Sequence, residues 1–208
     1  DTLFLTYKKA MDLRYGENPH QKACFYKETD LYGVSMADTT ILKGGPLNYN
    51  LAYDLNLALE VVMEFDKTAA VVIKSGVPVG VAMDKDMCRA YIHARDIEGG
   101  NAAMGAVVAF NGQVEKRTAK ELATSYIEAV IAPKFTDGAL EHFKSAKKLP
   151  NMRVVQVAGK KWTKQAGTLN IKSMLGGVLV QENNDRLLPD GAHMKLLFPP
   201  AGWNPKDE

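Results

Sequence analysis

Residues 50–74 read NLAYDLNLALEVVMEFDKTAAVVIK, and this stretch decides the fold class. Its apolar residues recur every three or four positions from Leu51 to Met63, which places them on one face of a helix. The β-branched run at 69–73 follows directly and is typical of a strand buried on both faces. We therefore predict a helix over 50–63 and a buried strand immediately after it.

The alternation of helix and strand continues along the chain. Further helices are predicted at 84–95, 118–126 and 136–144, and further strands at 2–7, 24–26, 106–110, 129–132, 152–157 and 176–181. Strands that alternate with helices predict an α/β layered sandwich. We expect one α/β unit over 1–185 and a tail or linker over 186–208, where Gly191 to Met194 resembles a cloning remnant.

The composition is that of an ordinary globular chain. Of the 208 residues, 46% are hydrophobic and 24% charged, and the net charge of +2 comes from interleaved signs. This pattern does not favour nucleic-acid binding, and no apolar run approaches the roughly 18 residues of a membrane helix. The first residues lack the features of a secretory signal, so we expect a cytoplasmic location. Cys24 and Cys88 lie outside any CxxC spacing, which predicts two reduced thiols.

Two places could carry chemistry. Lys74 follows the buried strand and precedes a segment at 75–80 that we interpret as a Gly and Pro turn. Because open α/β sheets bind ligands at the carboxyl ends of their strands, Lys74 could stabilise an anion there, or it could be a solvated lysine at a strand end. The loop at 13–21, LRYGENPHQ, could grip a phosphorylated ligand through Arg14, or its Asn18 and His20 could cap neighbouring backbone.

The chain resembles a known family at five stretches. LRYGENPHQ is similar to the AICAR transformylase part of the bifunctional purine-biosynthesis protein whose other part is IMP cyclohydrolase. The resemblance continues, in the family's order, through GPLNYNLAYD at 45–54, MGAVVAFN at 104–111, APKF at 132–135 and LGGVLVQ at 175–181. It covers roughly residues 3–185.

The resemblance implies a fold and a reaction. The fold is a cytidine-deaminase-like α/β/α sandwich with a mixed sheet and no zinc. The reaction is formyl transfer from 10-formyltetrahydrofolate, as co-substrate, to AICAR in purine biosynthesis. The implied partners are AICAR or a related purine ribonucleotide, and either a second copy in a homodimer or a second transformylase unit.

By motif position, the resemblance also implies site residues. Lys74 falls on the lysine that stabilises the transition state, and Ser75 falls where the family has its catalytic histidine. The positions that correspond to substrate-binding residues are Arg14, Tyr15, His20, Gly105 and Glu128.

Two departures leave two functions open. Ser75 cannot accept a proton near neutral pH as imidazole does, and losing a positioned base typically costs about 10² to 10⁴ in rate. The chain also stops after one deaminase-like unit, whereas the family's transformylase part is about twice as long. The chain is then either a partial or divergent transformylase, or a non-catalytic nucleotide-binding or scaffold subunit that retains the fold.

Overall fold

The structure, a computed structural model, describes residues 2–29, 33–97, 99, 103–158 and 168–184. The chain divides into two compact units, residues 1–164 and 165–208, and each is described by itself. The expected tail at 186–208, including the segment Gly191 to Met194, lies outside the described residues.

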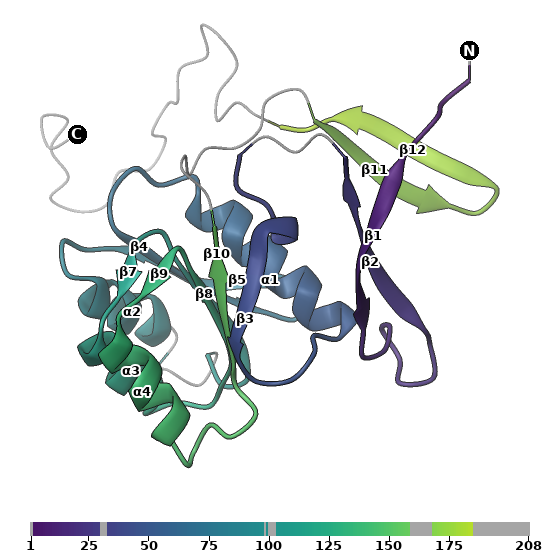
Figure 1. Cartoon of the computed structure of the whole chain (residues 1–208). Helices are drawn as coiled ribbons and strands as arrows, with labels where there is room; N and C mark the ends of the chain where they lie inside the picture. The colour runs from purple at the N-terminus through teal and green to yellow at the C-terminus, as the bar shows by residue number, and fades with distance from the viewer. Residues whose placement is uncertain (1, 30–32, 98, 100–102, 159–167, 185–208) are drawn as a thin grey trace, which may run out of the picture. The chain divides into compact units, whose positions relative to one another are not determined.

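A six-stranded mixed sheet forms the centre of the first unit (Figure 1). Its strands, in spatial order, are β3 (Thr39–Lys43), β10 (Arg153–Val157), β8 (Ile127–Ala132), β6 (Ala106–Phe110), β4 (Ala69–Lys74) and β5 (Val77–Met83). Strands β6, β8 and β10 are parallel, whereas β4 runs antiparallel to β6, and β3 and β5 run antiparallel to their neighbours. The mixed sheet is therefore confirmed.

Helices cover both faces of this sheet, which confirms the three-layer sandwich. Helix α1 (Tyr49–Val62) lies on one face and buries Leu51, Leu55 and Leu59 against the sheet, as the apolar spacing predicts. The opposite face is covered by α2 (Met87–Asp96), α3 (Lys116–Leu122) and α4 (Asp137–Ser145). None of the helices in the described part of the chain is long and apolar enough to cross a membrane.

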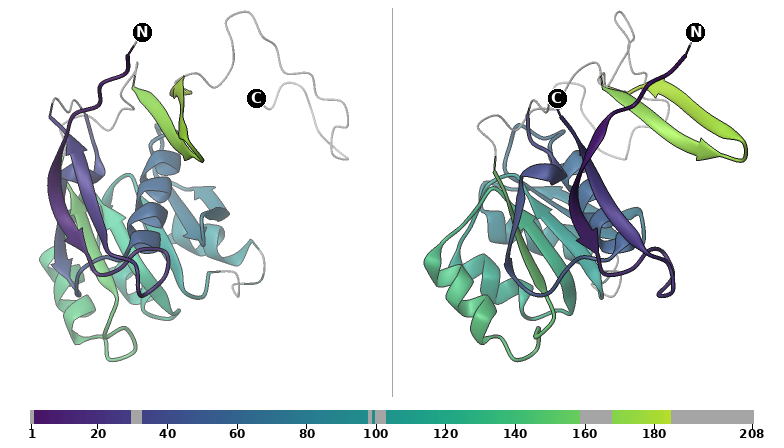
Figure 2. Two further views of the ribbon diagram at one scale, coloured as in Figure 1. Left: turned by 90° about the vertical axis from the view of Figure 1, so that its right-hand side faces the viewer. Right: turned by 45° about the vertical axis from the view of Figure 1, so that its right-hand side comes forward.

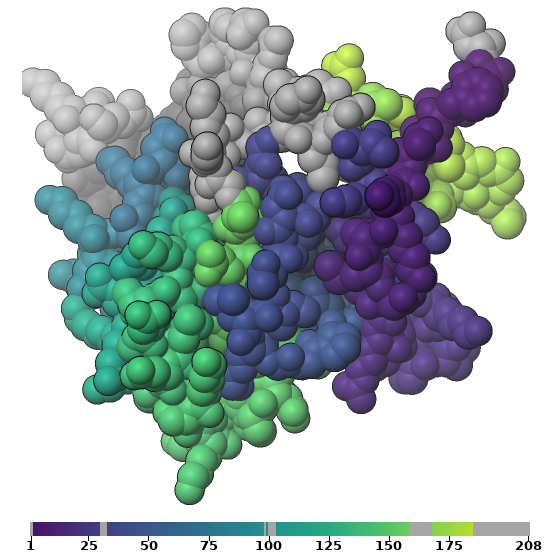
Figure 3. Space-filling view, viewed as in Figure 1, coloured from purple at the N-terminus to yellow at the C-terminus, as the bar shows by residue number. Residues whose placement is uncertain are grey.

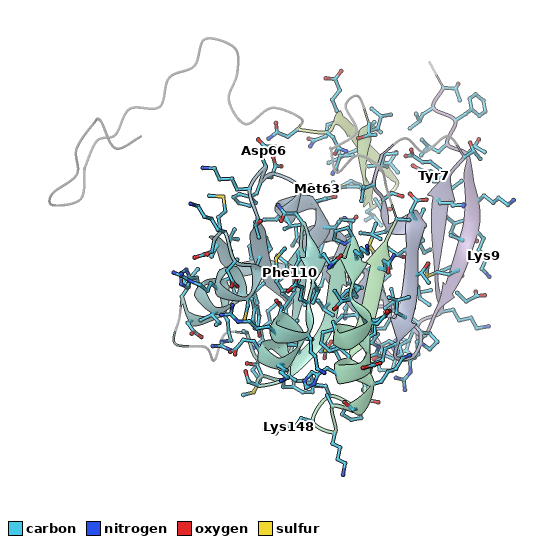
Figure 4. The ribbon with its side chains drawn as sticks, turned by 60° about the vertical axis from the view of Figure 1, so that its left-hand side comes forward. Tyr7, Lys9, Met63, Asp66, Phe110 and Lys148 are labelled. Carbon is cyan, nitrogen blue, oxygen red and sulfur yellow. The ribbon has the colours of Figure 1, made fainter. Side chains whose placement is uncertain are left out.

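Figure 4 shows how these layers enclose the core. Phe110, at the end of β6, is completely buried among side chains of the α2–α4 face. Met63 and Asp66, which follow α1, lie at the opposite end of the sheet from Lys148, which precedes β10. The sheet edge on the Lys148 side therefore holds the amino ends of β6, β8 and β10 and the carboxyl end of β4.

An N-terminal hairpin packs beside α1 (Figure 2). It consists of β1 (Tyr7–Leu13) and β2 (Ala23–Glu28), joined by the expected irregular loop. The first strand was predicted at 2–7, but the structure begins it at Tyr7, where pairing with Glu28 starts. The outer surface of β1, purple in Figure 3, is exposed, whereas Leu13 and Phe25 pack against the α1 side of the core.

The segment after Lys74 corrects the sequence analysis. We interpreted 75–80 as a turn, but only Ser75 and Gly76 form it, and β5 begins at Val77. Pro78 is compatible with this strand because β5 is at the edge of the sheet, where a strand tolerates a residue without an N–H group. The helix predicted at 118–126 is also displaced, since α3 covers Lys116–Leu122.

The remaining elements are short. A 3₁₀ turn covers Met36–Asp38, and β7 (Gln113–Val114) pairs in parallel with β9 (Lys134–Phe135). The second unit contains one described hairpin, β11 (Leu169–Met174) and β12 (Gly177–Glu182). The strand predicted at 176–181 corresponds to β12, while β11 and β3 were not predicted.

Candidate functional site

The loop that carries Arg14 and Tyr15 is fixed to the start of α1. The Arg14 amide donates to the Leu47 carbonyl at 2.8 Å, and the Tyr49 amide donates to the Tyr15 carbonyl at 3.0 Å. Asn48 caps α1 by accepting from the Leu51 amide, and its Nδ2 donates to the Tyr15 hydroxyl at 3.0 Å. The GPLNYN motif therefore starts the helix and anchors the loop.

The same loop is closed by internal hydrogen bonds. The Gly16 amide donates to the Gln21 carbonyl at 2.8 Å, and Gln21 Oε1 accepts from the Asn18 amide at 2.7 Å. The Arg14 guanidinium carbon lies 5.6 Å from the centre of the Tyr15 ring. Arg14 and His20 are exposed, so a cation and an imidazole are presented to solvent by a closed loop.

Lys74 ends β4 and is followed by a two-residue turn. Lys74 pairs with Val77 across this turn, and both intervening residues have left-handed backbone angles, with φ of 51° at Ser75 and 76° at Gly76. This is the geometry of a tight hairpin turn that matches the strand twist. Asp54 of α1 accepts hydrogen bonds from both turn amides, at 3.2 Å from Ser75 and 2.7 Å from Gly76.

Gly105 and Glu128 lie at the starts of the two neighbouring strands. The Gly105 amide donates to the Tyr126 carbonyl at 2.7 Å, immediately before β6 and β8 begin to pair. Ala106 pairs with Ile127 and Val107 with Ala129, so Glu128 is the additional residue of a β-bulge and is half-buried. Bulges redirect a side chain relative to the regular alternation of a strand.

The register places these segments at one edge of the sheet. Ile73 is opposite Val107, so Lys74 and the turn after it lie beside Gly105, and the start of β8 comes next. The Arg14–Tyr15 loop meets α1 at Tyr49, and the turn meets it at Asp54, about 7.5 Å further along the axis at roughly 1.5 Å per residue. Segments that are far apart in sequence thus converge around the first half of α1.

This position corrects one step of the sequence reasoning. We expected Lys74 at the carboxyl end of its strand, and it does end β4, but the rule that open α/β sheets bind ligands there describes parallel strands. Because β4 is antiparallel to β6, its carboxyl end lies instead beside the amino ends of β6 and β8. The edge that holds the carboxyl ends of the parallel strands carries none of the expected site residues.

Two residues of the quoted motifs have structural contacts that the sequence analysis did not identify. Asp54, the last residue of GPLNYNLAYD, binds the turn after Lys74. Asn111, the last residue of MGAVVAFN, donates to the carbonyls of Phe65 and Lys67 and accepts from the Ala69 amide at 2.9 Å. A polar residue that ends a shared motif was the available signal in both cases.

Several ionisable groups with shifted pKa values lie outside the segments that carry the candidate site residues. Burial raises the pKa of the Tyr91 hydroxyl and of the Cys88 thiol, both on α2. Burial and the nearby Arg153 lower the pKa of Lys43, whose ammonium donates to the Leu149 carbonyl at 2.7 Å. Cys24 and Cys88 are both free thiols.

A pocket of ≈ 210 Å³ lies between the N-terminal hairpin and α1, lined in part by Phe25, Tyr49 and Tyr53. Across the described residues, no three His, Cys, Asp or Glu side chains are grouped so that they could hold a metal ion.

Comparisons with solved structures give partial likenesses. RibD of Acinetobacter baumannii is 15% identical with a TM-score of 0.38, over 49% of this chain and 34% of that one. A dCMP deaminase from the cyanophage S-TIM5 is 15% identical with a TM-score of 0.34, over 50% of this chain and 92% of that one.

Sequence comparisons cover most of the chain at higher identity. The family model described as AICARFT/IMPCHase bienzyme matches residues 1–197. The bifunctional purine biosynthesis protein PurH of Magnetococcus marinus is 40% identical over 194 residues, or 92% of this chain and 36% of that protein. PurH of Acetivibrio thermocellus is 39% identical over 187 residues, or 90% of this chain and 36% of that protein. This chain thus spans about a third of the length of these relatives, and it belongs to the AICARFT/IMPCHase bienzyme family.

Proposed function

We propose that the chain is a formyl-transfer unit that binds AICAR and moves a formyl group to it from 10-formyltetrahydrofolate in purine nucleotide synthesis. The observation that carries the proposal is the convergence of the Arg14–Tyr15 loop, the Lys74 turn and Gly105 at one sheet edge. If these motif positions served only the folding of their own segments, we would expect them to lie at separate places in the structure.

Each group has a role that its chemistry supports. The exposed Arg14 guanidinium suits bidentate binding of a phosphate, with Tyr15 and His20 as further contacts from the same loop. The Lys74 ammonium would stabilise the negative charge that develops on the formyl oxygen. Gly105 would allow the ligand to approach the backbone, and Glu128 would accept hydrogen bonds from it.

Ser75 limits the rate of this reaction. The amine of AICAR must lose a proton during formyl transfer, and a serine hydroxyl does not titrate near neutral pH. We therefore expect binding without fast turnover from this chain. A second candidate function follows from the same residue, in which the chain binds the nucleotide as a non-catalytic subunit and Ser75 carries no reaction step.

Calorimetric titration with AICAR tests the binding step. Arg14→Ala should weaken AICAR binding at least tenfold, whereas Lys67→Ala, at the opposite sheet edge, should leave the affinity unchanged. Lys67 is a suitable control because it is also an exposed cation. Equal affinity of the Arg14→Ala variant and the wild-type chain would remove Arg14 from the site.

A formyl-transfer assay distinguishes the two functions. With 10-formyltetrahydrofolate and AICAR present, Ser75→His should increase the turnover of a transformylase unit by about 10² or more. The substitution suits the position, because histidine is one of the residues that tolerate a left-handed backbone. Nucleotide binding with no turnover in either protein would favour the non-catalytic subunit.

The proposed site could also be shared between chains. We propose a second copy or a second transformylase unit as the partner that completes the folate contacts. Measuring the native mass with and without AICAR tests this, and a monomer with full formyl-transfer activity would contradict it.

A further inference from the structure

We propose that Asp54 is a positioning residue that holds Lys74 in place by binding the two backbone amides of the turn after it. The inference rests on the proposed function, because it assigns a task to the Lys74 turn. Its direct basis is one carboxylate that accepts from two successive amides: Oδ1 from Gly76 at 2.7 Å and Oδ2 from Ser75 at 3.2 Å.

The turn needs such a partner because its backbone is unfavourable for serine. Ser75 is the described non-glycine residue with a positive φ, and left-handed geometry costs free energy for a side chain with a Cβ atom. Successive amides in turns of this kind point toward a common centre and bind an anion there. Asp54 occupies that centre, and hydrogen bonds to an ionised acceptor are among the stronger ones.

The carboxylate is held by a rigid element. The neighbouring Leu55 is completely buried, and Leu51, one turn earlier, is 3% exposed. The Tyr53 ring also borders the turn, because a Cβ atom added at Gly76 would lie 3.5 Å from Tyr53 Cε1. Helix α1 therefore determines where the turn lies, and with it the end of β4 at Lys74.

Asp54 also helps to fix the distance between the two parts of the proposed site, the Arg14–Tyr15 loop and the Lys74 turn. The start of α1 binds the Arg14–Tyr15 loop through Asn48 and Tyr49, and Asp54 on the same helix binds the Lys74 turn. Phosphate binding and charge stabilisation must occur at a fixed separation if one ligand is to use both. Asp54 acts through the backbone to maintain that separation.

A double-mutant cycle tests this role. Asp54→Ala should weaken AICAR binding about tenfold. Glu60→Ala is the control, because Glu60 is exposed on the same helix and accepts a hydrogen bond from Asn56, one turn earlier. Ser75→Gly in the Asp54→Ala background should recover most of that loss, because glycine adopts a positive φ without strain. A merely destabilised helix would not be rescued by relieving backbone strain at residue 75 of the turn.

A second readout does not depend on AICAR. In heteronuclear NMR spectra, Asp54→Ala should shift the Gly76 amide and the Lys74 side-chain resonances and speed amide exchange in the turn, while Glu60→Ala should not. Unchanged Lys74 resonances in Asp54→Ala, or no rescue by Ser75→Gly, would overturn the positioning role. Absence of AICAR binding to the wild-type chain would instead overturn the proposed function, and the NMR comparison would still decide the role of Asp54.

Discussion

Replacing Asn111 should lower the free energy of unfolding, because its side chain makes three hydrogen bonds to the segment that leads into β4. Its side chain donates to the Phe65 carbonyl at 2.9 Å and the Lys67 carbonyl at 2.7 Å, and it accepts from the Ala69 amide at 2.9 Å. At about 1 kcal/mol for each bond, Asn111→Ala should cost about 2 to 3 kcal/mol, because the Lys67 bond is open to solvent. Without these bonds, the segment 65–69 that leads into β4 would no longer be held to residue 111 at the end of β6.

Urea unfolding measured by circular dichroism tests this estimate. For a chain of this size the same loss lowers the melting temperature by roughly 4 to 12 °C. Asn151→Ala is a matched control, because Asn151 is exposed on the loop before β10. A loss below about 0.5 kcal/mol for Asn111→Ala, or an equal loss in the control, would refute the claim that this motif asparagine supports the sheet.

Three further predictions concern packing, charge and thiols. Gly80→Ala should cost about 3 kcal/mol in urea unfolding, since the new Cβ atom would overlap the carbonyl oxygen of Ala94 in α2, and a neutral effect would contradict this contact. A hydrogen bond from the Arg89 amide holds the pKa of Asp86 below its ordinary value. Stability should therefore fall as the pH drops below about 4, and Asp86→Asn should flatten that part of the acid-unfolding curve; an unchanged curve would contradict it. Ellman's reagent should modify the exposed Cys24 quickly and the buried Cys88 only on unfolding, and equal rates would contradict the burial.

The sequence alone predicted the helices and strands whose apolar residues recur with a clear period. The apolar spacing of α1 and the β-branched runs of β4 and β6 are confirmed within a few residues, because these elements bury whole faces. Strand β5 was missed because VPVG looks like a loop, and only its position at the sheet edge makes proline acceptable there. Strand β3 was missed because its partner, β10, is more than a hundred residues away.

The candidate site residues came from the sequence, but their arrangement did not. Motif resemblance suggested Arg14, Lys74 and Gly105 as candidates, while the antiparallel direction of β4 places Lys74 beside Gly105. The sequence placed Lys74 correctly at the carboxyl end of β4, but it did not show that β4 is antiparallel to β6, so that this end lies beside the amino ends of β6 and β8. The contact of Asp54 with the turn depends on the packing of α1, which local patterns do not encode.

Amide chemical-shift mapping with AICAR tests the central claim most directly. If the loop at Arg14, the turn at Ser75 and the strand start at Gly105 form one nucleotide site, AICAR should shift amide resonances in all three segments. Resonances of α4 (Asp137–Ser145), which packs on the other face of the sheet, should not move. Shifts in a single segment, or in α4 in place of these three, would contradict the account.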